Sequence, residues 1–166
     1  AAPPARGRMS QPSDTERAEM QRLIDRAHAA SHEPGKAGIA AALLRDGRVI
    51  AEGVNHVHLI PDPTQHAEIV ALGRAAQALG QADLSGCTLL STLQPCEMCL
   101  AAMRFAGIDR VIFAAKQESV PAKYFAFPHL HLADFLGASD SPGAGFTAIG
   151  GVMEAQVLDL YASGQE

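Results

Sequence analysis

Apolar side chains of the amino-terminal third follow a helical period. Residues 13–16, Ser-Asp-Thr-Glu, form a capping box of the kind that starts helices. Apolar positions then recur at helical spacing, at Met20, Leu23, Ile24 and Ala27. The pattern predicts a helix that begins after Ser13 and ends near Ser31, before a Pro-Gly pair.

Two continuous apolar runs follow, residues 38–44 and 49–55, on either side of the turn sequence Arg-Asp-Gly-Arg at 45–48. Such runs around a turn signal predict a β-hairpin. Beyond it, the pattern predicts helices over 65–79 and 95–106, and strands over 88–92 and 110–115.

After residue 116 the periodicity weakens, and we expect a short helix over 130–136, a turn-rich loop over 139–145, a fifth strand over 146–152 and a closing helix over 153–162. Strands that alternate with helices after an initial hairpin are typical of an α/β fold. We therefore predict a three-layer α/β/α architecture with a mixed, roughly five-stranded sheet.

The length of 166 residues suits one domain with a substantial core, which we place at 13–166. Residues 1–12 are rich in Ala, Pro and Arg and lack the apolar centre of a secretory signal, so we expect a disordered leader there. No apolar run approaches the roughly 18 residues of a membrane span.

The charge balance bears on partners. Thirteen Lys and Arg against eighteen Asp and Glu give a net charge of −5. A protein that grips a polyanion usually carries a basic stripe, and the one dense basic stretch here is residues 6–8. The carboxyl end, residues 157–166, contains no Lys or Arg. Nucleic acid is therefore disfavoured as a partner.

The most informative chemistry lies in two short motifs, His-Ala-Glu at 66–68 and Pro-Cys-Glu-Met-Cys at 95–99. Together they supply three good zinc ligands, His66, Cys96 and Cys99, and one carboxylate, Glu68, that need not bind the metal. A structural zinc site usually has four protein ligands, whereas a catalytic site keeps three and leaves a position for water. The motifs therefore predict a catalytic zinc, with Glu68 placed to move protons.

Other interpretations apply to single residues. A pair of cysteines at this spacing is also found in redox sites and in halves of structural zinc sites. The remaining cysteine, Cys87, is interpreted as a small buried apolar residue. His56 and His58 are interpreted as exposed loop residues in preference to pocket residues. For the aromatic segment 124–129, two interpretations remain open: a loop that covers the core, or a lid that stacks on a planar base.

The two motifs and their flanks, residues 62–69 and 92–99, resemble the zinc deaminases of the cytidine-deaminase fold. The resemblance extends over about residues 38–115 and is to the branch with guanine deaminases and tRNA adenosine deaminases. It implies one zinc per chain, a homodimer, and a proton-shuttle role for Glu68. It also implies that Asn55 and the backbone N–H of Ala67 bind the base. Gln94 stands where many relatives carry Glu.

The expected activity is zinc-dependent hydrolytic deamination of a free nucleobase or nucleoside, with release of ammonia. Guanine is favoured, because segment 62–69 resembles guanine and tRNA adenosine deaminases more than cytosine deaminases, and the acidic charge disfavours tRNA. The alternatives are a tRNA adenosine-to-inosine deaminase, a cytosine deaminase, and a zinc-stabilised binding module without catalysis. Thiolate ligands suit a reducing compartment, so we expect a cytoplasmic enzyme.

Overall fold

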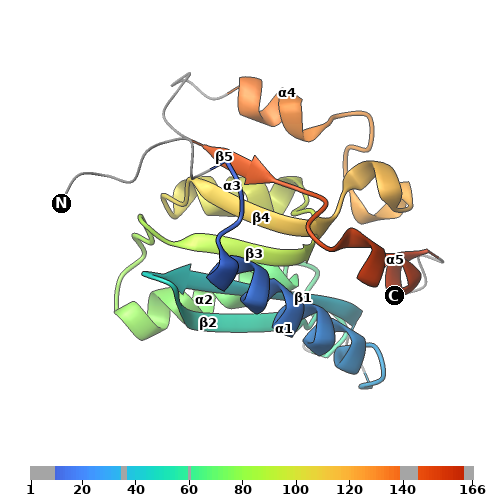
Figure 1. Ribbon diagram of the computed structural model, residues 1–166, viewed down its shortest axis with the longest axis horizontal. Helices are drawn as coiled ribbons and strands as arrows, with labels where there is room; N and C mark the ends of the chain where they lie inside the picture. Colours follow the sequence, from blue (N-terminus) through green and yellow to red (C-terminus); the bar gives the residue numbers. More distant parts are fainter. Residues whose placement is uncertain (1–9, 35–36, 60, 139–145, 163–166) are drawn as a thin grey trace.

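The computed structural model describes residues 10–34, 37–59, 61–138 and 146–162 (Figure 1). The predicted turn-rich loop over 139–145 and residues 1–9 of the expected leader lie outside them. The helices and strands, with three 3₁₀ turns, are α1 (Asp14–Ala30), β1 (Ala37–Arg45), β2 (Arg48–Asn55), α2 (Ala67–Leu79), β3 (Thr88–Leu93), α3 (Glu97–Phe105), β4 (Arg110–Ala115), η2 (Gln117–Ser119), η3 (Ala122–Tyr124), α4 (Leu132–Gly137), β5 (Thr147–Ile149), η4 (Glu154–Gln156) and α5 (Leu158–Tyr161).

The five strands form one mixed sheet in the order β2-β1-β3-β4-β5. β1 pairs antiparallel with both β2 and β3, whereas β3, β4 and β5 pair in parallel. β2 and β3 therefore run in the same direction, and their carboxyl ends reach the same edge of the sheet. The predicted mixed five-stranded sheet is confirmed.

Helices cover both faces of the sheet, which confirms the predicted three layers. Figure 1 shows α1 in front of the sheet and α2 and α3 behind it. On the α1 side, the hydroxyl of Tyr161 from α5 donates to the carbonyl of Gly38 at 2.8 Å and lies 2.8 Å from the hydroxyl of Thr92. α5 is thereby fastened to β1 and β3.

The core lies around β1, whose residues Ala37 to Leu44 are all buried. Its run of alanines leaves room for helices on both faces, and larger side chains come from the neighbouring elements. The predicted apolar side of α1 is confirmed, since Met20, Leu23, Ile24 and Ala27 are at most 1% exposed. Burial of one large aliphatic side chain contributes about 1.5–3 kcal/mol.

The carboxyl-terminal third departs from the sequence-based expectation. The predicted fifth strand over 146–152 is reduced to the three residues of β5. The predicted continuous helix over 153–162 is wrong, because the backbone breaks twice: Met153 has a left-handed φ of 55°, and Val157 has φ −120° and ψ −7°. A helical period of apolar residues does not reveal such local backbone conformations.

No helix among the described residues is long and apolar enough to cross a membrane.

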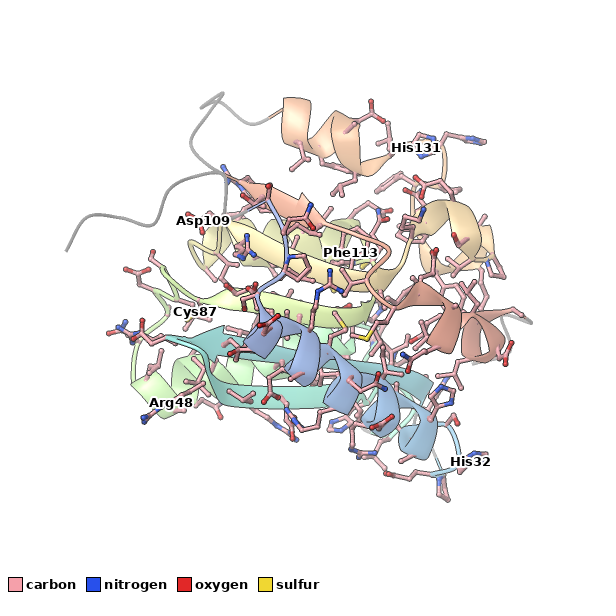
Figure 2. The ribbon with its side chains drawn as sticks, viewed as in Figure 1. His32, Arg48, Cys87, Asp109, Phe113 and His131 are labelled. Atoms are coloured by element: carbon pink, nitrogen blue, oxygen red, sulfur yellow. The ribbon has the colours of Figure 1, made fainter. Side chains whose placement is uncertain are left out.

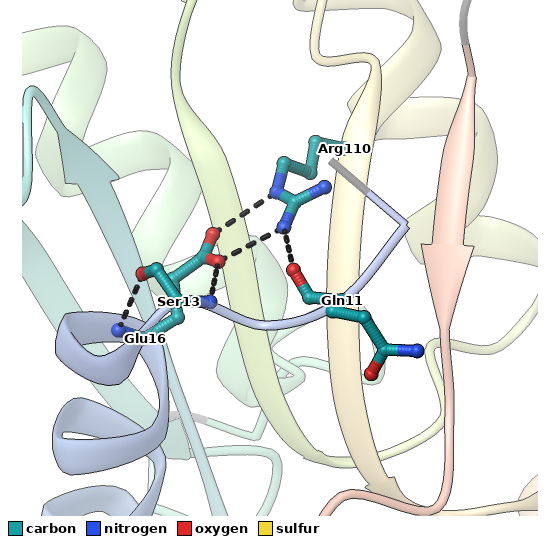
Figure 3. Close-up of polar contacts among 4 residues, drawn as sticks. All are labelled: Gln11, Ser13, Glu16 and Arg110. Atoms are coloured by element: carbon teal, nitrogen blue, oxygen red, sulfur yellow. Dashed lines mark hydrogen bonds and ion pairs between the residues drawn. The ribbon is translucent and has the colours of Figure 1, made fainter. Parts of the chain in front are cut away.

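A buried ion pair joins the start of α1 to β4 (Figure 3). The capping box is present, with Glu16 N–H donating to Ser13 Oγ at 3.1 Å and Ser13 N–H to Glu16 Oε1 at 2.8 Å. Arg110 donates to both oxygens of Glu16, at 3.0 and 2.9 Å, and to the carbonyl of Gln11 at 3.2 Å. Gln11, which belongs to the expected leader, is therefore hydrogen-bonded to β4.

Burial alone would raise the pKa of Glu16, but the hydrogen bonds and charge of Arg110, together with Ser13, outweigh it and hold that pKa below its usual value. Such a carboxyl stabilises the folded protein above its unfolded pKa and loses this contribution as the pH falls through its folded pKa.

Replacing Arg110 by Ala leaves the Glu16 carboxylate buried without its cation. We expect the free energy of unfolding at neutral pH to fall by about 3 kcal/mol, measured by denaturant titration. The difference in unfolding free energy between the parent and the variant should narrow as the pH falls below 4.5, the ordinary pKa of Glu. The parent protein then loses the stability that the Glu16–Arg110 ion pair contributes. Arg17→Ala, at an exposed position of α1, is the matched control. A deficit independent of pH would contradict the assignment.

Candidate metal centre and its pocket

Two helix starts bring the predicted ligands together. His66 is the N-cap of α2, with extended φ and ψ of −64° and 155°, and Cys96 is the N-cap of α3. Cys99 lies in the first turn of α3 and is fully buried. Because β2 and β3 end at the same edge of the sheet, the helices that follow them begin side by side.

The three ligand atoms have the spacing of a tetrahedral zinc site. Cys96 Sγ lies 3.7 Å from Cys99 Sγ, and His66 Nδ1 lies 3.5 and 3.8 Å from the two sulfurs. Zinc bonds of about 2.3 Å to sulfur and about 2.0–2.1 Å to nitrogen separate two sulfurs by about 3.8 Å and a sulfur and nitrogen by about 3.6 Å in tetrahedral geometry. Among the described residues, this is the group of His, Cys, Asp and Glu that could hold a metal ion.

The charges of the sulfurs also fit a cation. Hydrogen bonds from Cys99 and His66 lower the pKa of the Cys96 thiol to about 4 despite its burial. The pKa of Cys99 is raised, first by its hydrogen bond to Cys96 and then by burial and the nearby carboxylate of Glu68. Two buried thiolates side by side need a positive charge between them, so binding of zinc must displace the Cys99 proton.

Glu68 lies beside the three ligands but is not part of the ligand group. Its side chain is buried, with Oε2 3.5 Å from Cys99 Sγ, and Ser91 Oγ donates to Oε1 at 2.8 Å. Burial and the charge of Cys96 raise the pKa of Glu68. One oxygen is thus fixed by a hydroxyl of β3, and the other faces the ligand group.

A pocket of about 230 Å³ opens over this centre. Glu68, His66 and Cys96 line it, together with Ala37, Ile39, Asn55, Val57, His58, Leu93, Gln94, Lys123 and Tyr124. The structure therefore brings Asn55 to the predicted site. The Ala67 side chain is fully buried at the start of α2 and is not among the lining residues.

The single-residue interpretations can now be compared with the fold. Cys87, labelled in Figure 2, is 2% exposed and immediately precedes β3. Cys96 follows the same strand, so the two cysteines lie beyond opposite ends of it. His58 is exposed, as expected for a loop histidine, yet it also lines the pocket.

The aromatic segment is divided between the pocket and the interior. Tyr124 lines the pocket, whereas Phe125 is buried against Cys96 and Cys99. Phe127 is 61% exposed.

Sequence reasoning missed several residues of the site. Ser91 contacts Glu68 from 23 positions away, and Glu97 accepts a hydrogen bond from Ala126 N–H 29 positions away. Lys123 is a further pocket residue without a motif of its own. The only signal for Glu97 was its place between the two cysteines, and nothing in the local pattern points to Ser91.

The comparisons with known proteins agree with this geometry. The tRNA-specific adenosine deaminase of Agrobacterium fabrum is 40% identical over 113 residues, which cover 64% of this chain and 74% of that protein. The guanine deaminase of Bacillus subtilis is 42% identical over 76 residues, 46% of this chain and 49% of that protein. The chain thus aligns with about half the length of the second relative.

A solved structure from studies of A-to-I editing by tRNA:A34 deaminases is 31% identical and superposes with a TM-score of 0.71, covering 86% of this chain and 99% of that chain. The family model described as the cytidine and deoxycytidylate deaminase zinc-binding region matches residues 13–115, from the capping box to the end of β4. The metal-ligand group and its carboxylate lie within that match, and the chain belongs to the zinc-dependent deaminase family of cytidine and deoxycytidylate deaminases.

Proposed function

We propose that the protein removes the amino group from a free nucleobase or nucleoside, with guanine as the first candidate. The observation that carries the proposal is the small pocket over Glu68 and the ligand group. Its volume of about 230 Å³ lies below the roughly 300–1,000 Å³ of sites for drug-sized ligands, as suits one planar ring.

His66, Cys96 and Cys99 would hold the zinc. Bound zinc supplies a Lewis acid that makes a water molecule strongly nucleophilic near neutral pH. Glu68 would carry both protons of the attacking water, the first to the ring nitrogen and the second to the departing amine. The reaction consumes one water, replaces the amino group with an oxo group and releases ammonia.

Two groups would orient the base. Asn55 Oδ1 accepts a hydrogen bond from Val57 N–H at 3.0 Å, which fixes the amide and leaves Nδ2 as a donor at the pocket wall. The N–H of Ala67 belongs to the first turn of α2, where backbone donors have no intrahelical acceptor. Both are suited to an oxygen acceptor on the ring.

Two features favour guanine over adenine in tRNA. Asn55 and Lys123 bring hydrogen-bond donors to the pocket, which suits a base with a ring carbonyl. Lys123 is also the single Lys or Arg that lines the pocket among the described residues, and the chain carries a net charge of −5. A polyanion would gain little from such a surface.

The second candidate is adenosine in tRNA. It is supported by the Agrobacterium relative and by the solved tRNA:A34 deaminase structure. Cytosine is a third candidate. A non-catalytic zinc-stabilised module is disfavoured, because a buried carboxylate held by Ser91 has no use in a protein without catalysis.

We also propose that the protein acts as a homodimer in the cytoplasm. Phe105 on α3 is 94% exposed and Phe127 is 61% exposed, and burial of these large apolar side chains against a second copy of the chain would stabilise a dimer. The three cysteines are free thiols, which suits a reducing compartment.

Glu68→Gln should retain zinc and lose activity by at least about 10²-fold, because the amide cannot carry the proton. The measurements are the metal content of the purified protein and the rate of ammonia release. A variant that released ammonia at nearly the parent rate would rule out the assigned role and favour a different acid-base group.

Cys99→Ala should reduce bound zinc from about one ion per chain to a small fraction, because only two protein ligands remain. Cys87→Ala is the matched control, since Cys87 is buried away from the centre and should leave the metal content unchanged. Metal analysis after gel filtration distinguishes the two. Equal zinc loss in both variants would refute the ligand assignment.

Ammonia release from guanine, adenine, cytosine, their nucleosides and a tRNA tests the substrate. We expect the highest kcat/KM for guanine. Because binding to a polyanion weakens steeply with salt, a tRNA reaction would show strong salt dependence and a free-base reaction would not. Activity on tRNA alone would overturn the free-base proposal together with the charge argument.

A further inference from the structure

The segment between β4 and α4 forms one wall of the pocket. We call residues 117–127 the roof segment; it contains η2 and η3. Lys123 and Tyr124 of this segment line the pocket, and Phe125 packs in the same buried cluster as Cys96 and Cys99. The roof segment therefore touches both the substrate pocket and the surroundings of the metal ligands.

Side chains on either side of Cys96 hold the two ends of the roof segment. Gln94 is 5% exposed, and its Oε1 accepts a hydrogen bond from the N–H of Gln117 at 2.9 Å. Glu97 Oε2 accepts one from the N–H of Ala126 at 2.7 Å. The first bond fixes the start of the segment and the second fixes its end.

The position of Gln94 is itself well determined. Its N–H donates to the carbonyl of Ala115 at 2.8 Å, so the backbone of Gln94 is held to the last residue of β4, and its side chain is buried. Glu97 is in the first turn of α3, where the helix dipole favours a negative charge. Its bond to Ala126 is charge-assisted and short, and such bonds are about twice as strong as neutral ones.

We propose that Gln94 and Glu97 are positioning residues for the substrate: through the roof segment they place Lys123 and Tyr124 in the pocket wall. Neither residue needs to carry out chemistry for this role. The loss of either acceptor would release one end of the wall, and the substrate would then have to order it on binding. The inference rests on the proposed function of the pocket as the substrate site.

A purely structural role makes a different prediction. If the two bonds only stabilise the fold, their loss lowers the melting temperature and leaves the KM of the folded enzyme unchanged. If they position the pocket wall, KM rises while zinc content stays constant, because His66, Cys96 and Cys99 are untouched.

The test compares Glu97→Ala, which removes the acceptor, with Glu97→Gln, which keeps an oxygen there. We expect KM for the best substrate to rise about tenfold in the first and less than about threefold in the second, with kcat changed little. Glu118→Ala is the matched control, since it removes an exposed carboxylate from the roof segment itself and should leave KM unchanged. Gln94→Leu and Gln94→Glu form a second pair with the same expected order.

Hydrogen exchange supplies a readout without catalysis. The amide of Ala126 should exchange faster in Glu97→Ala, and that of Gln117 in Gln94→Leu, than in the parent protein. Faster exchange with an unchanged KM would overturn the proposal, as would failure of Glu97→Gln to restore KM, or a loss of activity that only follows loss of zinc.

Failure of the proposed function is a separate result: the parent protein would not deaminate free bases. If it acted on tRNA instead, the same KM comparison would be made with tRNA, and an unchanged KM there would equally overturn the role of Gln94 and Glu97.

Discussion

The direction of β1 is the constraint on which the site depends. Because β1 runs against both its neighbours, β2 and β3 point the same way although one strand separates them. The chain therefore leaves both strands at one edge of the sheet, and α2 and α3 begin there together. Had β1 paired in parallel with either neighbour, the His66 and Cys96 N-caps would lie at opposite edges. As β1 actually runs, the dipoles of both helices favour negative charge at one point, where the Cys96 thiolate and the side chains of Cys99 and Glu68 gather.

Close packing of α2 against β2 fixes the positions of the ligands more precisely than the direction of the strands alone. At Gly53 of β2, a Cβ atom would lie 2.6 Å from Cγ1 of Val70 and 3.1 Å from the carbonyl of Ala67. The absence of a side chain there lets the first turns of α2 rest directly on the strand. An arrangement of ligands within a few tenths of an ångström of zinc geometry needs this kind of support from the backbone, since flexible side chains alone would not hold it.

Most of the amino-terminal fold and the metal ligands could be predicted from the sequence, because their signals are local. The capping box at Ser13 and the motif at Cys96 each lie within a few residues. Ser91 could not be predicted in this way, because its hydroxyl reaches Glu68 only when β3 packs beside α2. The helix expected over 153–162 is wrong for a different reason: the apolar residues recur at helical spacing, but the backbone is left-handed at Met153 and leaves helical geometry again at Val157. Patterns of burial do not encode such a φ value.

The difference between local sequence signals and contacts that form only in the fold also explains why the substrate is harder to predict than the reaction. Relatives of both classes, a tRNA-specific adenosine deaminase and a guanine deaminase by name, match this chain at similar identity, 40% and 42%. The metal-ligand group and Glu68 of this chain lie at the starts of α2 and α3, which the sheet places side by side. Part of the pocket wall, formed by Lys123 and Tyr124, instead comes from a segment after β4, beyond the family match that ends at residue 115. This segment contacts the surroundings of the metal ligands through hydrogen bonds from Gln117 to Gln94 and from Ala126 to Glu97, and through the packing of Phe125 against the two cysteines. On the proposed function, a change at Lys123 or Tyr124 can thus alter which base fits without removing a metal ligand.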